Sequence, residues 1–340
     1  MKSSFLAFAV LASAAATASA QSSVVVYGLL DGGITSEHGG AEGNVTKVST
    51  GVQSGSRLGF KGTEDLGNGL KAKFQLENGF DLDTGKQRQG GLLFGRQAWL
   101  GLSGDFGTVA LGRQNNPLFV TLDSIDAFET GLSGSTTNLM NPGSVRVNNS
   151  VTYSLPNLKG VSGTVMYGLG EVAGDSKAGR TLGASLAYSN GPLVLTGAYD
   201  RQNLATNKLQ KLALIAGTYD FGVLKAHLAV ETEKNDSVVG GFDNRDYMAA
   251  VTVPVGTSGQ FLANFIKRQA RNDSPAVGGR QVAVAYLYAL SKRTNAYTSL
   301  GNIRNDSAGT NFVGDASSGG SAPLPGDTSR ALSIGIRHKF

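Results

Sequence analysis

The stretch Lys71–Glu77 reads KAKFQLE and alternates strictly between polar and apolar side chains. Ala72, Phe74 and Leu76 share one parity, and the lysine, glutamine and glutamate side chains share the other. A period of two places successive side chains on opposite faces of a β-strand, so this stretch predicts a strand with one apolar and one polar face. The pattern recurs through the chain, for example over residues 225–233 and 330–340.

The alternating segments are long for a soluble protein. Many run for about ten residues, the length that a tilted strand needs to cross a bilayer, whereas strands of soluble proteins average about five or six. The pattern predicts sixteen strands, over residues 23–31, 55–63, 69–82, 92–103, 107–115, 148–155, 161–169, 180–189, 193–202, 208–220, 223–234, 245–255, 260–270, 280–290, 295–304 and 330–340.

The predicted connections alternate between tight turns and long loops, which is typical of outer-membrane barrels. The tight turns include residues 104–107, 190–192, 220–222 and 256–259, and the long loops include residues 36–55, 84–91, 116–149, 171–179, 235–244, 271–279 and 305–329. An unpaired strand edge in a bilayer leaves polar backbone groups without partners, at several kcal/mol each. We therefore expect an all-β fold, a sixteen-stranded antiparallel transmembrane barrel whose first strand pairs with its last and whose lumen holds water.

Aromatic residues near the predicted strand ends support the same fold, because amphipathic rings prefer the headgroup level of a membrane. The set expected to form these girdles is Tyr27, Phe60, Phe80, Phe94, Phe106, Tyr153, Tyr167, Tyr188, Tyr219, Phe221, Tyr247, Phe261, Tyr286, Tyr297 and Phe340.

The N-terminus has a different character from the rest of the chain. Lys2 precedes an apolar run over residues 5–16, and Ala18-Ser19-Ala20 follows as a small-residue cleavage pattern. These features predict a signal peptide over residues 1–20, cleaved after Ala20, and a barrel domain over residues 21–340. The alternative, a buried N-terminal helix, fits the flanking residues less well.

Composition excludes several functions. The chain contains no cysteine, so disulfides and zinc–thiolate sites are absent. Its net charge of +5 comes without a basic run, which argues against nucleic acid as a partner. His38, His227 and His338 lack metal-ligand spacing and are expected to be solvated, so we expect no metal and no cofactor. No catalytic motif indicates an enzyme.

Six segments, in order along the chain, resemble the trimeric general porins of β-proteobacteria, of the Neisseria, Bordetella and Comamonas type. They are VYGLLD at 26–31, SRLGFKGTEDLGNGLKA at 56–72, GRQAWLGL at 95–102, FGTVALGRQ at 106–114, YALSKRT at 288–294 and GIRHKF at 335–340. The resemblance implies a sixteen-stranded barrel, a homotrimer, and a third extracellular loop that folds into the lumen as a constriction. It also implies that Phe340 is the outer-membrane assembly signal.

The constriction residues follow from this resemblance. The inward loop is expected at residues 116–149, and its acidic residues are Asp123, Asp126 and Glu129. By similarity, Arg57 and Arg96 match basic constriction positions, and Arg146 completes the cluster by position.

Strand parity supports these arginines unevenly. Arg57 shares the polar face of its strand with Gly59 and Lys61. Arg96 shares parity with apolar residues, on a face that would suit a subunit interface. Arg113 ranks lower as a candidate. All of them can also be read as ordinary solvated charges of a polar lumen.

The expected function is passive diffusion of small hydrophilic solutes across the outer membrane, with a mild preference for anions. Arginines that stay charged, opposite carboxylates across a narrow aqueous gap, attract anions through a salt-screened field. Outer-membrane lipid and small solutes are the expected partners. Two alternatives stay open, namely a substrate-specific channel for organic acids or sugars and a plugged structural or adhesin barrel.

Overall fold

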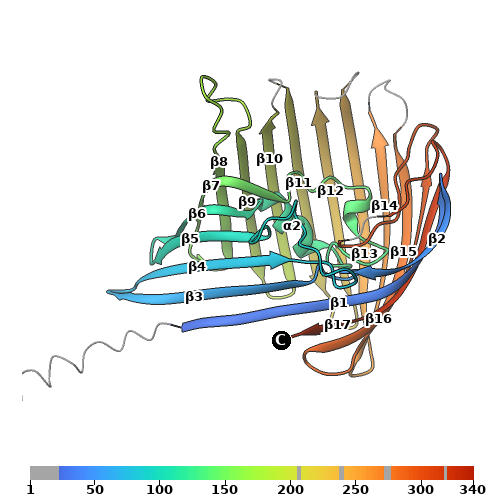
Figure 1. Ribbon diagram of the computed structural model, residues 1–340, viewed down its shortest axis with the longest axis horizontal. Coiled ribbons are helices and arrows are strands. Elements are labelled where there is room, and N and C mark those ends of the chain that lie inside the picture. The colour runs from blue at the N-terminus through green and yellow to red at the C-terminus, as the bar shows by residue number, and fades with distance from the viewer. Residues whose placement is uncertain (1–22, 205–207, 237–240, 272–276, 318–319) are drawn as a thin grey trace, which may run out of the picture.

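The strands of the protein form one antiparallel sheet that closes on itself as a barrel (Figure 1). This computed structural model describes residues 23–204, 208–236, 241–271, 277–317 and 320–340, and the predicted signal peptide lies outside them. The first strand pairs with the last over Leu29–His38 and Arg330–Lys339, which confirms the predicted closure. Backbone hydrogen bonds of 3.0 Å in each direction join Gly28 to Phe340 at this seam.

Seventeen strands and two short helical segments occur in the described residues. In chain order they are β1 (Ser23–Gly40), β2 (Gly43–Thr50), β3 (Arg57–Gly67), β4 (Leu70–Gly79), β5 (Gln97–Gly104), β6 (Gly107–Asn115), α2 (Pro117–Ile125), η2 (Thr136–Asn138), β7 (Arg146–Ser154), β8 (Val161–Gly168), β9 (Thr181–Asn190), β10 (Leu193–Asn203), β11 (Leu209–Asp220), β12 (Lys225–Asn235), β13 (Phe242–Val255), β14 (Gly259–Ala270), β15 (Gly279–Ala289), β16 (Thr294–Asn305) and β17 (Thr328–Lys339).

Sixteen of these strands close the ring, as the alternation predicts, and β2 is additional. The sequence assigns residues 36–55 to a loop, but β1 runs on to Gly40 and β2 folds back onto it as a hairpin. The prediction missed β2 because its side chains do not alternate in polarity. It is held instead by backbone pairing and by an ion pair of 2.7 Å between Lys47 and Glu37.

Short turns lie at one end of the barrel and long loops at the other, as predicted. Two residues join β5 to β6 and β9 to β10, whereas 22 residues, 306–327, join β16 to β17. Both described chain ends lie at the short-turn end, because β1 starts there and β17 finishes there. None of the described helices is long and apolar enough to cross a membrane.

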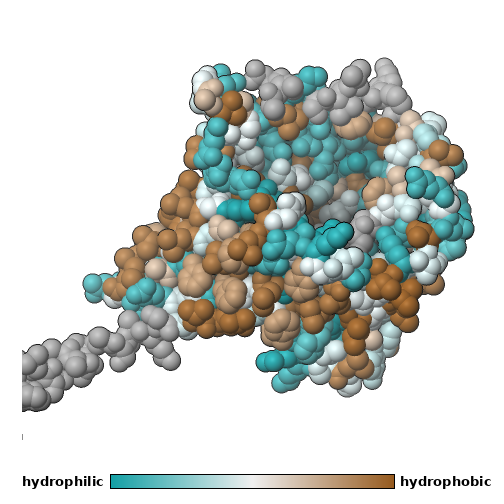
Figure 2. Space-filling model, in the orientation of Figure 1, coloured by the Kyte–Doolittle hydropathy of each residue, from teal (hydrophilic) through white to brown (hydrophobic). Residues whose placement is uncertain are grey.

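Apolar side chains cover the outer face of the barrel over β3–β6, and polar ones gather in its hollow (Figure 2). Exposed outward residues such as Leu228, Ile334 and Leu300 continue this apolar face around the ring. The aromatic girdle prediction is wrong for Tyr27 and Tyr297, whose hydroxyls donate to the carboxylates of Glu77 and Asp31 inside the barrel at 2.8 and 2.6 Å.

Candidate functional site

Loop 3, defined here as residues 116–145 between β6 and β7, enters the barrel through the helix α2. Asn116 caps the helix by accepting a hydrogen bond of 3.0 Å from the backbone N–H of Leu118, and Pro117 occupies its first turn. Leu118, Leu122 and Ile125 are buried along one face. This helix was not predicted, although Asn-Pro followed by apolar residues at spacings of four and three is a helix signal.

The helix packs against the inner wall formed by β8–β12, mostly against β9 and β10. Leu212 and Leu214 of β11 point inward and join the same buried cluster as the helix side chains. Ala213 and Ile215 of β11 point outward, so this strand is apolar on both faces. A strand that is covered on both sides reads as a continuous apolar run, which explains why its inner face is not polar.

A buried carboxylate organises the turn that follows α2. Asp126 accepts hydrogen bonds of 2.9–3.1 Å from the backbone N–H groups of Phe128, Thr130 and Thr136 and from the Thr136 hydroxyl. Burial raises the pKa of Asp126 to about 6, and the hydrogen bonds oppose that shift. Asp126 therefore shapes loop 3 itself, because its carboxylate oxygens accept hydrogen bonds from groups of the same loop.

The far side of loop 3 is tied to the barrel wall by polar contacts. The backbone N–H and side-chain amide of Asn141 donate to Glu231 and Glu233 of β12 at 2.7 and 2.6 Å. Gly301 of β16 lets the loop approach closely, because a Cβ atom there would lie 2.1 Å from the carbonyl oxygen of Ser133. Loop 3 is thus held on several sides.

Two further segments fold inward beside loop 3, and the sequence analysis did not predict either of them. Residues 51–56, between β2 and β3, are largely buried, and residues 315–317 belong to the long connection before β17. The carbonyl oxygen of Val52 accepts from the backbone N–H of Leu132 at 2.6 Å and from that of Ala316 at 3.3 Å. All three inward segments therefore meet at one residue.

Together they border a cavity of about 860 Å³ inside the barrel. The structure brings all six predicted constriction residues to this cavity, namely Arg57, Arg96, Arg146, Asp123, Asp126 and Glu129. Among the described residues, seven lysine or arginine side chains and four carboxylates line it, a surplus of three cations. Arg88, Lys225, Arg337 and Lys339 also line the cavity and were not predicted, whereas Arg113 is not part of the lining.

The three predicted arginines lie side by side on the wall. Arg57 opens β3 and donates from Nε to the carbonyl of Gly55 at 2.9 Å. Arg96 donates from Nε to the Glu77 carboxylate at 2.6 Å, and its own carbonyl accepts from Nε of Arg146 at 3.1 Å. The guanidinium groups repel one another and share Glu77 as a counter-charge.

Two of these positions differ from the sequence prediction. The predicted strand 92–103 begins only at Gln97, so Arg96 precedes β5 and strand parity does not apply to it. Its side chain faces the lumen, while Leu100 of the same predicted face points outward. Arg146 is the first residue of β7, not part of the loop.

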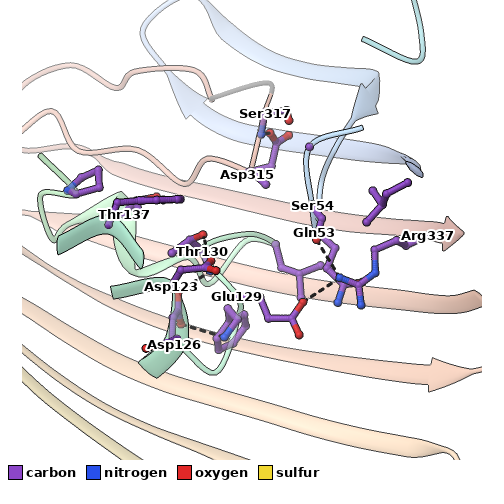
Figure 3. Close-up of a pocket in the computed structure, with 18 of the residues that line it drawn as sticks. Gln53, Ser54, Asp123, Asp126, Glu129, Thr130, Thr137, Asp315, Ser317 and Arg337 are labelled. Carbon is purple, nitrogen blue, oxygen red and sulfur yellow. Dashed lines mark hydrogen bonds and ion pairs between the residues drawn. The ribbon is translucent and has the colours of Figure 1, made fainter. Parts of the chain in front are cut away.

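The acidic residues of loop 3 face the arginines less directly. Asp123 accepts a hydrogen bond of 2.5 Å from the Thr130 hydroxyl, and partial desolvation inside the barrel raises its pKa. The Glu129 carboxylate pairs with Nη1 of Arg337 at 2.9 Å, and Ser54 accepts from the same nitrogen at 2.9 Å (Figure 3). Glu129 thereby neutralises a cation that the prediction did not include.

The three histidines lie apart. His227 is buried below loop 3, where its Nδ1 lies 2.8 Å from the carbonyl oxygen of Ile125 and its Nε2 lies 3.2 Å from the Thr252 hydroxyl. The prediction that it is solvated is therefore wrong, because α2 covers it. His38 and His338 are exposed on the surface.

The family model described as Gram-negative porin matches residues 7–308. Outer membrane porin protein 32 of Delftia acidovorans is 32% identical over 358 residues and covers all of both chains. Major outer membrane protein P.IB of Neisseria meningitidis serogroup B is 32% identical over 364 residues with the same full coverage.

A solved structure agrees with the sequence relatives. The anion-selective porin from Comamonas acidovorans superposes with a TM-score of 0.83 at 30% identity, and the match covers 94% of this chain and 100% of that one. These relatives are channels and not enzymes. The closed barrel, the lined cavity and the full-length matches lead to one conclusion: the chain belongs to the Gram-negative porin family and is a channel protein of the outer membrane.

Proposed function

We propose that this protein is a trimeric general porin, made with a signal peptide that is cleaved after Ala20, and that it passes small hydrophilic solutes with a mild preference for anions. The single observation that carries the anion preference is the surplus of cations around the cavity. In this proposal Arg57, Arg96 and Arg146 form the basic side of the constriction.

The cations of the cavity differ in how much charge they present. Arg96 is paired with Glu77, and Arg337 is paired with Glu129. Within the part of the chain that the structure describes, Arg57 and Arg146 form no ion pair with a carboxylate. Their fields extend into the aqueous gap, where screening acts over about 8 Å at physiological salt. These two guanidinium groups therefore contribute most to the attraction of anions.

Planar-bilayer recordings in a KCl gradient test this proposal. Arg57→Ser and Arg146→Ser, alone and together, are expected to move the reversal potential toward the value of a non-selective pore. Arg330→Ser is the matched control, because Arg330 is exposed on the outer face and does not line the cavity. Unchanged reversal potentials in both variants would contradict the assigned role of these arginines.

The trimer and the assembly role of Phe340 rest on the family resemblance. Phe340 is exposed on the outer face at the seam between β1 and β17, where a periplasmic assembly factor can reach it. Chromatography coupled to light scattering is expected to give three times the chain mass. Deleting Phe340 is expected to reduce assembled trimer in the outer membrane, and a monomeric mass for the intact protein would contradict the proposal.

A substrate-specific channel for organic acids is the second candidate. Neighbouring guanidinium groups that form no ion pair in the described chain, such as Arg57 and Arg146, can bind a carboxylate through paired hydrogen bonds. Citrate and succinate distinguish the candidates, because a specific channel shows saturable block of its conductance and a general pore does not. A measurable open conductance in either case excludes a plugged barrel.

A further inference from the structure

Loop 3 exposes an apolar surface to the cavity beside the arginines. Phe119 in the first turn of α2, and Pro142 and Val145 near the end of loop 3, line the cavity and are partly exposed. Residues that face the lumen of a membrane barrel are ordinarily polar, so an apolar surface at this place is unusual. We call Phe119, Pro142 and Val145 the apolar patch.

Backbone contacts place the apolar patch next to Arg146. Asn116 donates its backbone N–H to the carbonyl oxygen of Val145, the residue before Arg146, at 3.1 Å. The carbonyl oxygen of Asn116 accepts from the backbone N–H of Val120 at 3.0 Å, and this bond closes the helical turn that contains Phe119. The start of α2 and the start of β7 therefore lie side by side, with the apolar patch and Arg146 where they meet.

Arg146 is surrounded mainly by other cations. The charges that act on it most strongly are those of Arg96, Arg113, Glu77 and Arg57, so three guanidinium groups outweigh one carboxylate. Glu77 is already paired with Arg96 at 2.6 Å. A carboxylate that lay against Arg146 would therefore relieve repulsion between cations, and arginine can hold a carboxylate through two N–H groups.

The acidic residue of loop 3 beside the apolar patch acts on other arginines. Asp123 lies one helical turn beyond Phe119 on the same side of α2, and both line the cavity. The charge of Asp123 interacts with those of Arg57 and Arg96. Within the described residues Arg146 forms no ion pair. Arg146 is therefore available to an anion that enters the lumen.

We propose that Arg146 and the apolar patch together favour aromatic monocarboxylates, such as benzoate, among the organic anions that pass through the pore. The carboxylate lies against the Arg146 guanidinium, and the ring packs on Phe119, Pro142 and Val145. Aromatic rings gain from packing on one another, and the contact removes apolar surface from water. Contact with four residues holds the solute weakly, so that it can leave again, as conduction requires. This preference rests on the proposed function, because it names the solute class that the same constriction favours.

Bi-ionic reversal potentials test the proposal, with KCl on one side of a planar bilayer and the potassium salt of benzoate, acetate or gluconate on the other. A pore that sorts anions by charge and size alone passes acetate more readily than the larger benzoate. Wild type is expected to pass benzoate more readily than acetate, and to pass the polar gluconate less readily than either. Phe119→Ala is expected to lower the benzoate/acetate permeability ratio roughly fivefold, to a value below one.

Val120→Ala on the same helix is the matched control, because Val120 is exposed but does not line the cavity. It should keep the wild-type benzoate/acetate ratio, and both variants should keep the wild-type reversal potential in a KCl gradient. Phe119→Leu retains an apolar side chain without a ring and is expected to give an intermediate ratio.

The comparison of solutes in wild type gives a result even if Phe119→Ala assembles poorly. A benzoate/acetate ratio at or below one in wild type, or a wild-type ratio in Phe119→Ala, would overturn the proposal. Failure of the proposed function gives a different result, namely the reversal potential of a non-selective pore in the KCl gradient.

Discussion

At the scale of single residues, Glu77 shows how one carboxylate reduces the positive charge of the lumen. It is buried between the arginines, pairs with Arg96 and accepts a hydrogen bond from Tyr27. It was not among the predicted constriction residues, although KAKFQLE places it on the polar face of β4. Alternation places Glu77 on the lumen side of its strand, but it does not identify which cations Glu77 neutralises, because that depends on distances between strands.

Glu77→Gln is expected to increase the preference for anions. The glutamine keeps an oxygen for Arg96 and removes one negative charge, and a unit charge at about 8 Å in water is worth roughly 0.5 kcal/mol. Because the change favours anions and disfavours cations, the permeability ratio should rise about fivefold. Reversal potentials measure it, with the exposed Glu64→Gln on β3 as control. A ratio equal to that of wild type, or below it, would count against Glu77 as a counter-charge.

At the scale of elements, the regular strands were predictable and the inward segments were not. Alternation and length identify the strands because the bilayer requires both. Residues 51–56 and 315–317 have no period, since each is held by irregular contacts such as those to the Val52 carbonyl. Two features of the sequence indicate α2, namely the Asn116-Pro117 helix start and the strand β11 that is apolar on both faces. Only when the two are combined do they predict that the helix covers the inner face of β11.

Leu122→Ala is expected to loosen loop 3 without opening the barrel. Leu122 is fully buried between α2 and the wall, and such truncations cost about 2–5 kcal/mol. The strands keep their backbone hydrogen bonds, so the loss falls on the loop. Single-channel current noise and proteolytic cleavage within residues 116–145 should both increase.

Val120→Ala is the matched control on the same helix, because Val120 is 50% exposed. It should behave as wild type in both measurements. If Leu122→Ala also behaves as wild type, the packing of α2 does not determine the position of loop 3.

At the scale of the whole molecule, we expect the charges of the lumen to attract anions through a weak electrostatic field, without a tight binding site. Screening lengths fall from about 10 Å at 0.1 M salt to about 3 Å at 1 M. The anion preference should therefore decrease toward unity as KCl is raised over this range. The Arg57→Ser/Arg146→Ser variant should show a weaker salt dependence, and a wild-type preference independent of salt would indicate direct anion binding instead.

The seam between β1 and β17 has a consequence for the order of the chain. Ten residue pairs and the bonds between Gly28 and Phe340 give it the same ladder as any covalently connected hairpin of the barrel. A circular permutant that joined the described ends by a short linker and opened the chain at Asp220–Gly222 would keep every strand neighbour. The barrel is in this sense a ring in which no particular strand has to come first. The described chain ends take the place of one of the eight connections at its short-turn end.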